Sequence, residues 1–259
     1  MCNKGRRRIF SSSFSPCQHE AMVPVILAHR GASATHPENT VRSFRAAKRA
    51  GADGVELDIR VSSDDQIVVV HDETIGGRLV GQMARAEFDD DVPDLAAALG
   101  SCGEMMVNIE VKNQRGKACY RLPEPLAELV VAEIRSAAGG PILLSSFDLA
   151  TVDALRRKGS YPTGWLIEPP MDAGEALQRV IAHGHQALHP HHTQVDAALV
   201  AAARRSGVKL FVWTVDDPRR QRELADLGVD GIITNRPAEA LAVLSQARSA
   251  AKAEDAGRS

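Results

Sequence analysis

Val55-Glu56-Leu57-Asp58-Ile59-Arg60 is a predicted strand with one apolar face and one charged face. Successive side chains of a strand point to opposite faces, so its three apolar residues share one face and its three charged residues share the other. Asn108-Ile109-Glu110-Val111-Lys112 repeats the pattern. Charged faces are unusual in parallel sheets, which are normally buried on both sides. In a closed barrel, the apolar faces can pack on outer helices while the charged faces point to the axis near the mouth.

The rest of the sequence alternates between strand-like runs and helix-like stretches from residue 23 onward. The predicted strands are Val25–Ala28, Gly54–Arg60, Met105–Val111, Ile142–Ser145, Gly164–Ile167, Ala187–His189, Lys209–Val215 and Gly231–Thr234. The predicted helices are Glu38–Ala50, Pro93–Leu99, Pro123–Ala137, Asp148–Lys158, Asp172–His183, Asp196–Ser206, Pro218–Leu227 and Pro237–Arg248. Several helices open with Asp or Pro and close near Gly, which is typical of helix ends.

Strand–helix units in a row favour a parallel sheet covered by helices, and eight parallel strands close a barrel. The alternative is an open doubly wound sheet, which usually carries a Gly-rich phosphate loop after its first strand. Here the first predicted strand is followed by His29-Arg30-Gly31 and no such loop. We therefore expect an α/β fold, a TIM (β/α)8 barrel in a single domain.

Composition limits the class of protein. With 259 residues, 44% hydrophobic and 25% charged, the chain has the size of one such barrel and the make-up of an ordinary soluble protein. A net charge of −2 gives no electrostatic reason to expect nucleic acid as a partner. No apolar run reaches the roughly 18–20 residues of a membrane span, so we expect no stable membrane insertion. The cysteines form no CxxC pair, which favours a reducing compartment and a cytoplasmic location.

The two ends of the chain differ from its middle. Residues 1–22 are basic and Ser-rich without the hydrophobic segment of a secretory signal, so we expect a disordered N-terminal tail. Residues 249–259 are rich in Ala and charge, and we expect a flexible C-terminal tail there. The barrel domain is predicted to span residues 23–248. Nothing in the sequence indicates the oligomeric state.

Three carboxylates lie on the charged faces of the two amphipathic strands. Glu56 and Asp58 have Cβ atoms roughly 6–7 Å apart along one strand, and Glu110 can reach toward them from the next. Unpaired carboxylates inside a barrel would cost several kcal/mol each, and a shared cation removes that cost. An all-oxygen set favours one divalent ion, Mg²⁺ or Ca²⁺, with Mn²⁺ also compatible. The competing interpretation is a set of surface ion pairs on solvated strands.

Two histidines are predicted at strand ends, each followed by a charged residue. His29 ends the first strand, and His71 ends a hairpin after the second. A single histidine is more often a satisfied core residue, but two in this setting favour acid–base catalysis. Together with a metal, and with Arg30 and Lys112 on phosphate oxygens, the pair suits cleavage of a phosphate diester.

Other candidates are weaker. Five histidines crowd the sixth predicted strand and its approach, but their spacing fits no common zinc motif, so a substrate-facing loop is favoured there. Trp213 is either a core residue or a wall of the substrate pocket. Asn235 could be only a helix N-terminal cap. The histidines of this group are His183, His185, His189, His191 and His192.

Six segments, in order, resemble the glycerophosphodiester phosphodiesterase family, and the resemblance runs from about Val25 to Pro237. The matching segments are His29-Arg30-Gly31 with Pro37-Glu38-Asn39-Thr40, Glu56-Leu57-Asp58 with His71-Asp72, Asn108-Ile109-Glu110-Val111-Lys112, Leu144-Ser145-Ser146-Phe147, Trp213-Thr214-Val215, and Gly228-Val229-Asp230-Gly231-Ile232-Ile233-Thr234. The resemblance implies a TIM barrel that hydrolyses glycerophosphodiesters to glycerol 3-phosphate and an alcohol.

The resemblance also implies roles for individual residues. His29 and His71 would be the acid–base pair, Glu56, Asp58 and Glu110 would hold the metal, and Arg30 and Lys112 would hold the phosphate. As a wall of the pocket, Trp213 is the third candidate substrate-binding residue. In this family the attacking group is thought to be the substrate's own glycerol hydroxyl, which forms a cyclic phosphate. The expected partner is therefore a small-molecule glycerophosphodiester.

The chain departs from the family pattern between the second and third barrel strands. The usual Arg-Thr-Thr-like stretch after His71-Asp72 is missing, and the insertion before Glu110 is shortened. Because the insertion normally helps to cover the substrate, a bulkier or lipid-like diester becomes more plausible. The alternative function is a phospholipase acting on lysophospholipid or sphingolipid head groups. A non-enzymatic barrel is disfavoured because all seven of the expected catalytic, metal-binding and phosphate-binding residues are present.

Overall fold

The computed structural model describes residues 23–137 and 139–245. The tails predicted at residues 1–22 and 249–259 lie outside this part of the chain. Within it, no helix combines the length and the apolar character needed to cross a membrane.

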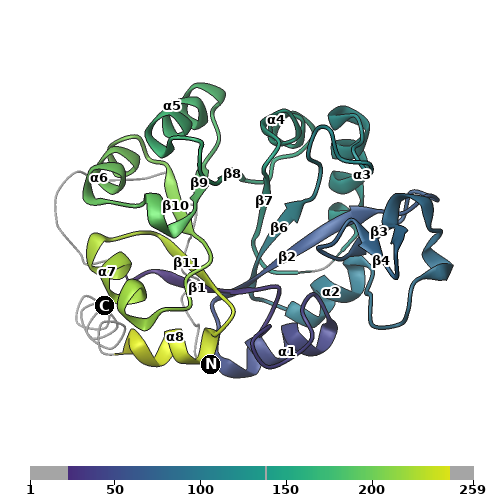
Figure 1. The fold of residues 1–259 in the computed structure, drawn as a ribbon, viewed down its shortest axis with the longest axis horizontal. Coiled ribbons are helices and arrows are strands. Elements are labelled where there is room, and N and C mark those ends of the chain that lie inside the picture. Colours follow the sequence, from purple (N-terminus) through teal and green to yellow (C-terminus); the bar gives the residue numbers. More distant parts are fainter. Residues whose placement is uncertain (1–22, 138, 246–259) are drawn as a thin grey trace, which may run out of the picture.

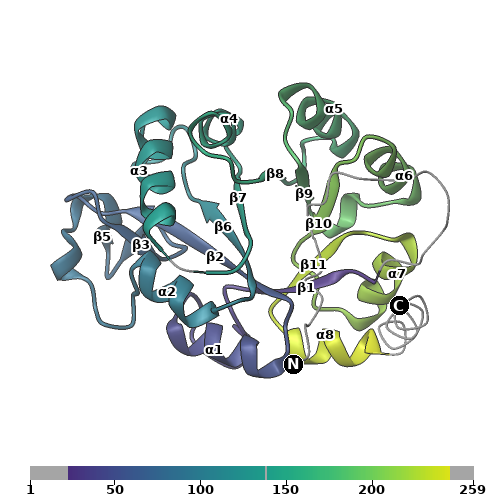
Figure 2. The ribbon, with the colours of Figure 1, turned by 180° about the vertical axis from the view of Figure 1, so that it is seen from behind.

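Eight parallel strands close into a barrel, as the sequence predicts (Figures 1 and 2). β1 pairs on one side with β11 and on the other with β2, which closes the ring. The barrel strands are β1 (Val25–His29), β2 (Gly54–Val61), β6 (Met106–Val111), β7 (Ile142–Ser146), β8 (Thr163–Ile167), β9 (Ala187–Pro190), β10 (Lys209–Val212) and β11 (Gly231–Thr234).

A helix follows each barrel strand, and the helices form the outer ring. They are α1 (Val41–Ala50), α2 (Leu95–Cys102), α3 (Pro123–Ser136), α4 (Leu149–Lys158), α5 (Ala173–His183), α6 (Ala197–Arg205), α7 (Pro218–Leu227) and α8 (Pro237–Val243). Asp148, Asp172 and Asp196 are N-caps, each accepting a hydrogen bond from a backbone N–H of the first turn.

Some predicted boundaries were wrong. α1 begins at Val41 rather than Glu38, because Thr40 caps the helix and Asn39 has a left-handed backbone (φ 55°). α2 begins after the cap Asp94 and runs on to Cys102. β10 ends at Val212, three residues early. α8 ends at Val243, and the predicted helix end at residues 246–248 lies outside the described part of the chain.

The segment between β2 and α2 forms a small projection from the side of the barrel (Figure 1). β3 (Ile67–Val69) pairs antiparallel with β2, and β4 (Thr74–Ile75) pairs with β5 (Arg78–Leu79). Two 3-10 helices, Val80–Gln82 and Arg85–Glu87, follow. The projection has its own apolar cluster, formed by Val68, Val80, Met83 and Phe88. It carries His71 in the turn after β3 and so positions that side chain at the barrel mouth.

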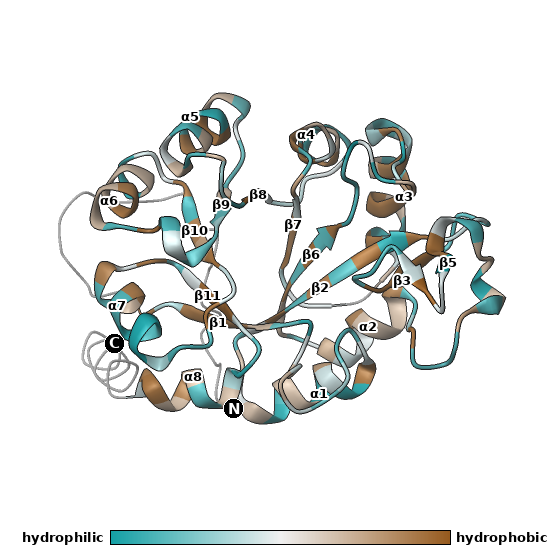
Figure 3. Cartoon of the chain, viewed as in Figure 1, coloured by the Kyte–Doolittle hydropathy of each residue, from teal (hydrophilic) through white to brown (hydrophobic). Residues whose placement is uncertain are grey.

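Apolar side chains fill two regions of the barrel. The odd-numbered residues of β2 and β6, such as Leu57 and Ile109, pack among helix residues outside the strands, as the alternation predicts. In Figure 3 the barrel strands are largely hydrophobic, whereas the helices alternate in character. A separate cluster draws its buried members only from strands, so it fills the barrel interior. It consists of Leu27, Met106, Leu143, Ala187, Phe211 and Ile233.

His189 of β9 also points into the barrel interior. Its ring stacks on Phe211 at 5.3 Å, and a Cβ on Gly164 would lie 2.5 Å from its Nε2. Gly164 therefore leaves the space that the imidazole occupies. Both ring nitrogens are buried without a hydrogen-bond partner, and burial lowers the pKa of His189 to about 3. The residue is a neutral buried group rather than the substrate-facing loop residue that the sequence favours.

This burial predicts a pH-dependent stability. Between about pH 6.5 and pH 3 the unfolded chain binds a proton at His189 that the folded chain does not, so stability falls as pH falls, by at most about 1.4 kcal/mol per pH unit. Urea unfolding of wild type and His189→Gln at several pH values measures it, and we expect the variant to have the shallower dependence. The same pH dependence of stability in wild type and His189→Gln would contradict this prediction. His36→Gln is the control for loss of an unrelated histidine.

Candidate functional site

The polar faces of β1, β2 and β6 meet at the carboxyl ends of the strands. Strand register places His29 beside Glu56 and Asp58 beside Glu110. Active sites of (β/α)8 barrels lie at this end of the strands. Even-numbered residues of the two amphipathic strands therefore come together at this end of the barrel.

Glu56, Asp58 and Glu110 come together in the structure. One oxygen from each lies within 4.8 Å of the others, and the side chains are buried, with Asp58 only 1% exposed. Glu56 Oε1 and Asp58 Oδ1 make no hydrogen bond. Buried carboxylate oxygens without donors are costly, so this set fits a hard divalent cation.

Two cations face the three carboxylates. Arg30 Nε lies 3.2 Å from Asp58 Oδ2, and its backbone N–H donates to Glu56 Oε2 at 3.0 Å. Lys112 Nζ lies 2.7 Å from Glu110 Oε1 and 3.6 Å from Asp58 Oδ1. Arg30 has a left-handed backbone (φ 55°), a conformation that is uncommon for residues other than glycine. Three carboxylates against two cations leave one negative charge in excess.

The pKa values of the three carboxyl groups are shifted in different directions. Burial, and then the charge of Asp58, raises the pKa of Glu110 to about 7. Burial and the two neighbouring carboxylates raise the pKa of Glu56 well above its usual value. Although burial opposes it, Lys112 and Arg30 lower the pKa of Asp58. The site therefore holds a proton readily when no additional cation balances its charge.

Asn235 fixes the state of His29. His29 Nδ1 lies 2.7 Å from Asn235 Oδ1, while Asn235 Nδ2 donates to Asp216 Oδ2 at 2.6 Å. Because Asp216 requires the amide nitrogen, Asn235 presents its oxygen and His29 must carry its proton on Nδ1. The other nitrogen, Nε2, lies 3.9 Å from Glu56 Oε2. Burial and then Arg30 lower the pKa of His29, so the neutral ring keeps a lone pair on Nε2.

Interpreting Asn235 as a helix cap is wrong. The cap of α8 is Arg236, which makes no side-chain capping bond. The side chain of Asn235 instead joins β11 to β1, and its backbone N–H donates to Asp216 Oδ1 at 2.9 Å. No local sequence signal indicates this contact, because Asn235 and His29 are 206 residues apart.

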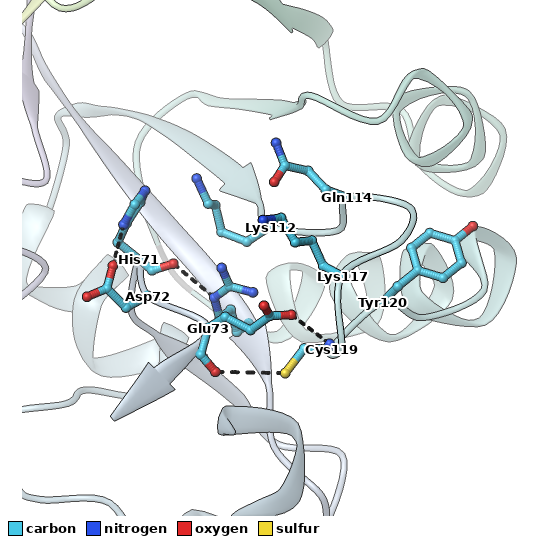
Figure 4. A pocket seen from close by; sticks show the side chains of 9 residues that line it. His71, Asp72, Glu73, Lys112, Gln114, Lys117, Cys119 and Tyr120 are labelled. Atoms are coloured by element: carbon cyan, nitrogen blue, oxygen red, sulfur yellow. Dashed lines mark hydrogen bonds and ion pairs between the residues drawn. The ribbon is translucent and has the colours of Figure 1, made fainter. Parts of the chain in front are cut away.

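His71 lies at the edge of a pocket of about 220 Å³ (Figure 4). Its Nδ1 donates to Asp72 Oδ1 at 2.8 Å, and Arg60 Nε donates to its backbone carbonyl at 2.9 Å. In Figure 4, His71 and Asp72 lie on one side, and Gln114 and Tyr120 on the other. Charged and polar side chains make up most of the lining, which consists of Arg60, His71, Asp72, Glu73, Lys112, Gln114, Lys117, Cys119 and Tyr120.

Asn39 and Glu38 support the site, although the sequence assigned them no role. Asn39 Nδ2 donates to Asp58 Oδ2 at 2.8 Å, and its Oδ1 accepts from the Asp58 backbone N–H. Glu38 accepts two hydrogen bonds of 3.0 Å from Arg30 Nη1. The segment Pro37-Glu38-Asn39-Thr40 was a matching motif, but its long-range partners become visible only in the folded chain.

Trp213 is half-buried just beyond the end of β10. Its Nε1 donates to the His189 carbonyl at 2.8 Å, and its ring packs edge-on against Phe147 at 5.4 Å. Lys112 Nζ in turn lies 5.6 Å from the centre of the Phe147 ring. The indole is thus part of an aromatic wall beside Lys112, and it also packs on the interior cluster.

The five histidines near the sixth barrel strand do not form one group. His191 and His192 follow β9 at the carboxyl end, where His191 packs against Trp213. His189 lies inside the barrel. His183 and His185 lie before β9, at the opposite end, beside Asp153. β9 runs through the barrel from one end to the other, so histidines that are close in sequence lie at different ends of it.

A sequence model described as "Glycerophosphoryl diester phosphodiesterase family" matches residues 29–239. The chain belongs to this family. It is similar to a glycerophosphodiester phosphodiesterase of Caldanaerobacter subterraneus subsp. tengcongensis, with 30% identity over 83% of this chain and 96% of that protein. Glycerophosphodiester phosphodiesterases are phosphoric diester hydrolases, the enzyme class predicted from the sequence.

Solved structures share the fold. A phosphodiesterase of Oleispira antarctica, in complex with the product sn-glycerol-3-phosphate, has a TM-score of 0.78 at 23% identity and covers 86% of this chain and 97% of its own. A glycerophosphodiester phosphodiesterase of Thermotoga maritima has a TM-score of 0.70 at 27% identity, with the same coverage. These similarities agree with the barrel described above.

The contact between His29 and Asn235 leads to a prediction. Removing the acceptor in Asn235→Ala should lower the pKa of His29 further, because the hydrogen bond raises it. The ring should also lose its fixed Nδ1–H tautomer. ¹⁵N NMR of the His29 ring during a pH titration without added metal measures both. Asp216→Asn, which can still accept from the amide, is the matched control. An unchanged tautomer in Asn235→Ala would refute the assignment.

Proposed function

We propose that this protein is a metal-dependent phosphodiesterase that hydrolyses glycerophosphodiesters to glycerol 3-phosphate and an alcohol. One observation carries the proposal: three buried carboxylates converge beside two cationic side chains and His29 at the barrel mouth. The named relative from Caldanaerobacter and the family description support the substrate class.

Glu56, Asp58 and Glu110 would hold the divalent cation. The donor set consists of oxygens, which favours Mg²⁺ or Ca²⁺, with Mn²⁺ compatible. The unbonded Glu56 Oε1 and the excess negative charge both support this assignment. When bound, the cation would polarise the phosphoryl oxygens and offset the charge that develops on them.

His29 and His71 would move the protons. His29 is the proposed base because its environment keeps Nε2 unprotonated. It would take the proton of the glycerol hydroxyl, whose oxygen then forms a bond to phosphorus. His71, oriented by Asp72, would give a proton to the departing alcohol oxygen as its bond to phosphorus breaks. Water would then open the cyclic phosphate with the two roles reversed, which yields glycerol 3-phosphate.

Arg30 and Lys112 would bind the phosphate oxygens, and Trp213 would wall the pocket. Asp58 holds both cationic groups at the site before substrate arrives. Preorganised charges stabilise a transition state without reorganising during the reaction. Lys112 also lines the pocket that contains His71, so the two groups can act on one substrate.

The pocket favours a polar alcohol over a lysolipid. Its lining includes Arg60, Lys112 and Lys117, with Asp72 and Glu73. Over residues 23–137 and 139–245, Leu122 and Ile181 are the exposed large apolar side chains, and they lie on different helices or their caps. A lysolipid enzyme would be expected to present an apolar surface to its substrate. Lysophospholipid or sphingolipid cleavage therefore remains the second candidate.

Replacing either histidine should stop turnover. We expect His29→Ala and His71→Ala each to lower kcat by about 10²–10⁴-fold, the usual contribution of one acid–base group. Steady-state assay on a glycerophosphodiester panel measures it, with circular dichroism to verify folding. Arg205→Gln, at an exposed position at the end of α6, is the control. A folded variant with near-normal activity on the panel would exclude the pair, and faster cleavage of lysolipids by wild type would favour the second candidate.

Metal dependence should follow the ionisation of Glu110. Below about pH 7 a proton on this carboxyl competes with the cation, so the half-activating Mg²⁺ concentration should increase as pH falls. Enzyme stripped with EDTA and assayed with Mg²⁺ at about pH 6 and about pH 8 measures this. Glu110→Gln should need at least about tenfold more Mg²⁺, as expected when a ligand is lost. Full activity in EDTA would remove the metal from the proposal.

A further inference from the structure

Asp153, His183 and His185 form a second cluster of metal-ligating side chains, remote from the barrel mouth. Asp153 lies on α4, His183 is the last residue of α5, and His185 precedes β9. His183 Nδ1 lies 2.8 Å from Asp153 Oδ1, and His185 Nε2 lies 3.1 Å from the same oxygen. The three groups therefore converge at the amino ends of β8 and β9.

The three ligand atoms lie slightly closer together than in a tetrahedral metal site. Two ligand atoms bound to Zn²⁺ at about 2.0–2.2 Å are roughly 3.3–3.5 Å apart in a tetrahedral site. The observed separations from Asp153 Oδ1, 2.8 and 3.1 Å, are about 0.2–0.7 Å shorter, and one atom of each residue lies within 4.8 Å of the others. His183 is 39% exposed at its side chain, so a water molecule can complete the set, and small movements of this residue open the space.

His185 has a partner for the hydrogen bond expected of a metal-bound histidine. Its Nδ1 lies 2.9 Å from Thr163 Oγ1, and that hydroxyl donates to Gln186 Oε1 at 3.4 Å. With its hydrogen directed to Gln186, Thr163 accepts from His185 Nδ1–H. Histidine ligands usually donate their second N–H to an oxygen in this way, which fixes the tautomer.

In that tautomer, Nε2 of His185 presents a lone pair to the carboxylate of Asp153. Two acceptors 3.1 Å apart repel unless a cation or a proton lies between them. Burial lowers the pKa of His185, which disfavours the proton. The competing arrangement turns the Thr163 hydroxyl toward Nδ1 and lets Nε2–H donate to Asp153. That arrangement requires no metal and is the one that the experiment below must exclude.

We propose that Asp153, His183 and His185 bind one late first-row divalent metal ion, with Zn²⁺ as the expected occupant. Imidazole nitrogens select such ions, whereas the all-oxygen set at the barrel mouth suits hard cations. Arg156, whose Nε donates to the Gly184 carbonyl at 2.8 Å, adds a positive charge nearby and limits the affinity. The ion would join α4 to the end of α5, which makes it a structural site.

The test compares Zn²⁺ binding by the full chain and by variants. Protein is stripped with EDTA, saturated with Mg²⁺ to occupy the carboxylate site, and titrated with Zn²⁺ by calorimetry. We expect His183→Gln and Asp153→Asn to bind one equivalent fewer than wild type, or to bind it at least about 100-fold more weakly. His36→Gln controls for loss of an unrelated imidazole, and Zn²⁺ sites elsewhere are common to all of the proteins.

A second measurement does not depend on the number of Zn²⁺ ions bound. Co²⁺ in the same site should give wild type the visible absorption of a tetrahedral ion, and either variant should lose it. His183 is partly exposed, so His183→Gln leaves the buried His185 in place. The proposal is overturned if wild type, His183→Gln and Asp153→Asn bind Zn²⁺ with equal stoichiometry and affinity and wild type gives no tetrahedral Co²⁺ spectrum. The three side chains would then form hydrogen bonds only, with no metal site.

Discussion

The burial of three carboxylates on two adjacent strands constrains the rest of this site. Asp58 is nearly inaccessible to solvent, yet it remains the most readily ionised of the three because Lys112, Arg30 and Asn39 all contact it. Each of these partners is then held in turn. Arg30 is anchored by Glu38, and the turn that contains Arg30 takes a left-handed backbone. The charge of one buried side chain thus helps to hold the loop between β1 and α1 against the strands.

The fold followed from the sequence because it depends on local periodicity. Alternating apolar residues, together with the Asp caps and terminal glycines that most of the helices have, mark the strand–helix units, and their order predicts the barrel. The convergence of Glu56, Asp58 and Glu110 followed as well, since register between neighbouring parallel strands leaves little freedom. One helix boundary was wrong because a side chain has a distant partner: the bond of Asn39 to Asp58 holds Asn39 outside α1.

The support of the site could not be predicted in the same way. His29 depends on Asn235 and Asp216, which lie at the other end of the chain and meet β1 only when the barrel closes. The group of five histidines shows the converse. Their closeness in sequence suggested one functional loop, but β9 carries them through the barrel, so that they occupy three environments with different solvation.

The projection between β2 and α2 has a consequence of its own. It is folded around a separate apolar cluster, yet it delivers His71 and several residues of the pocket wall. The projection is nevertheless tied to the barrel, because Ile67 and Val69 of β3 belong to the barrel core and the Val70 N–H donates to the Asp58 carbonyl at 3.0 Å. Only the four side chains of the separate cluster lie outside that core, so sequence change among descendants of one ancestor is best tolerated there, at a distance from the strands that carry the carboxylates.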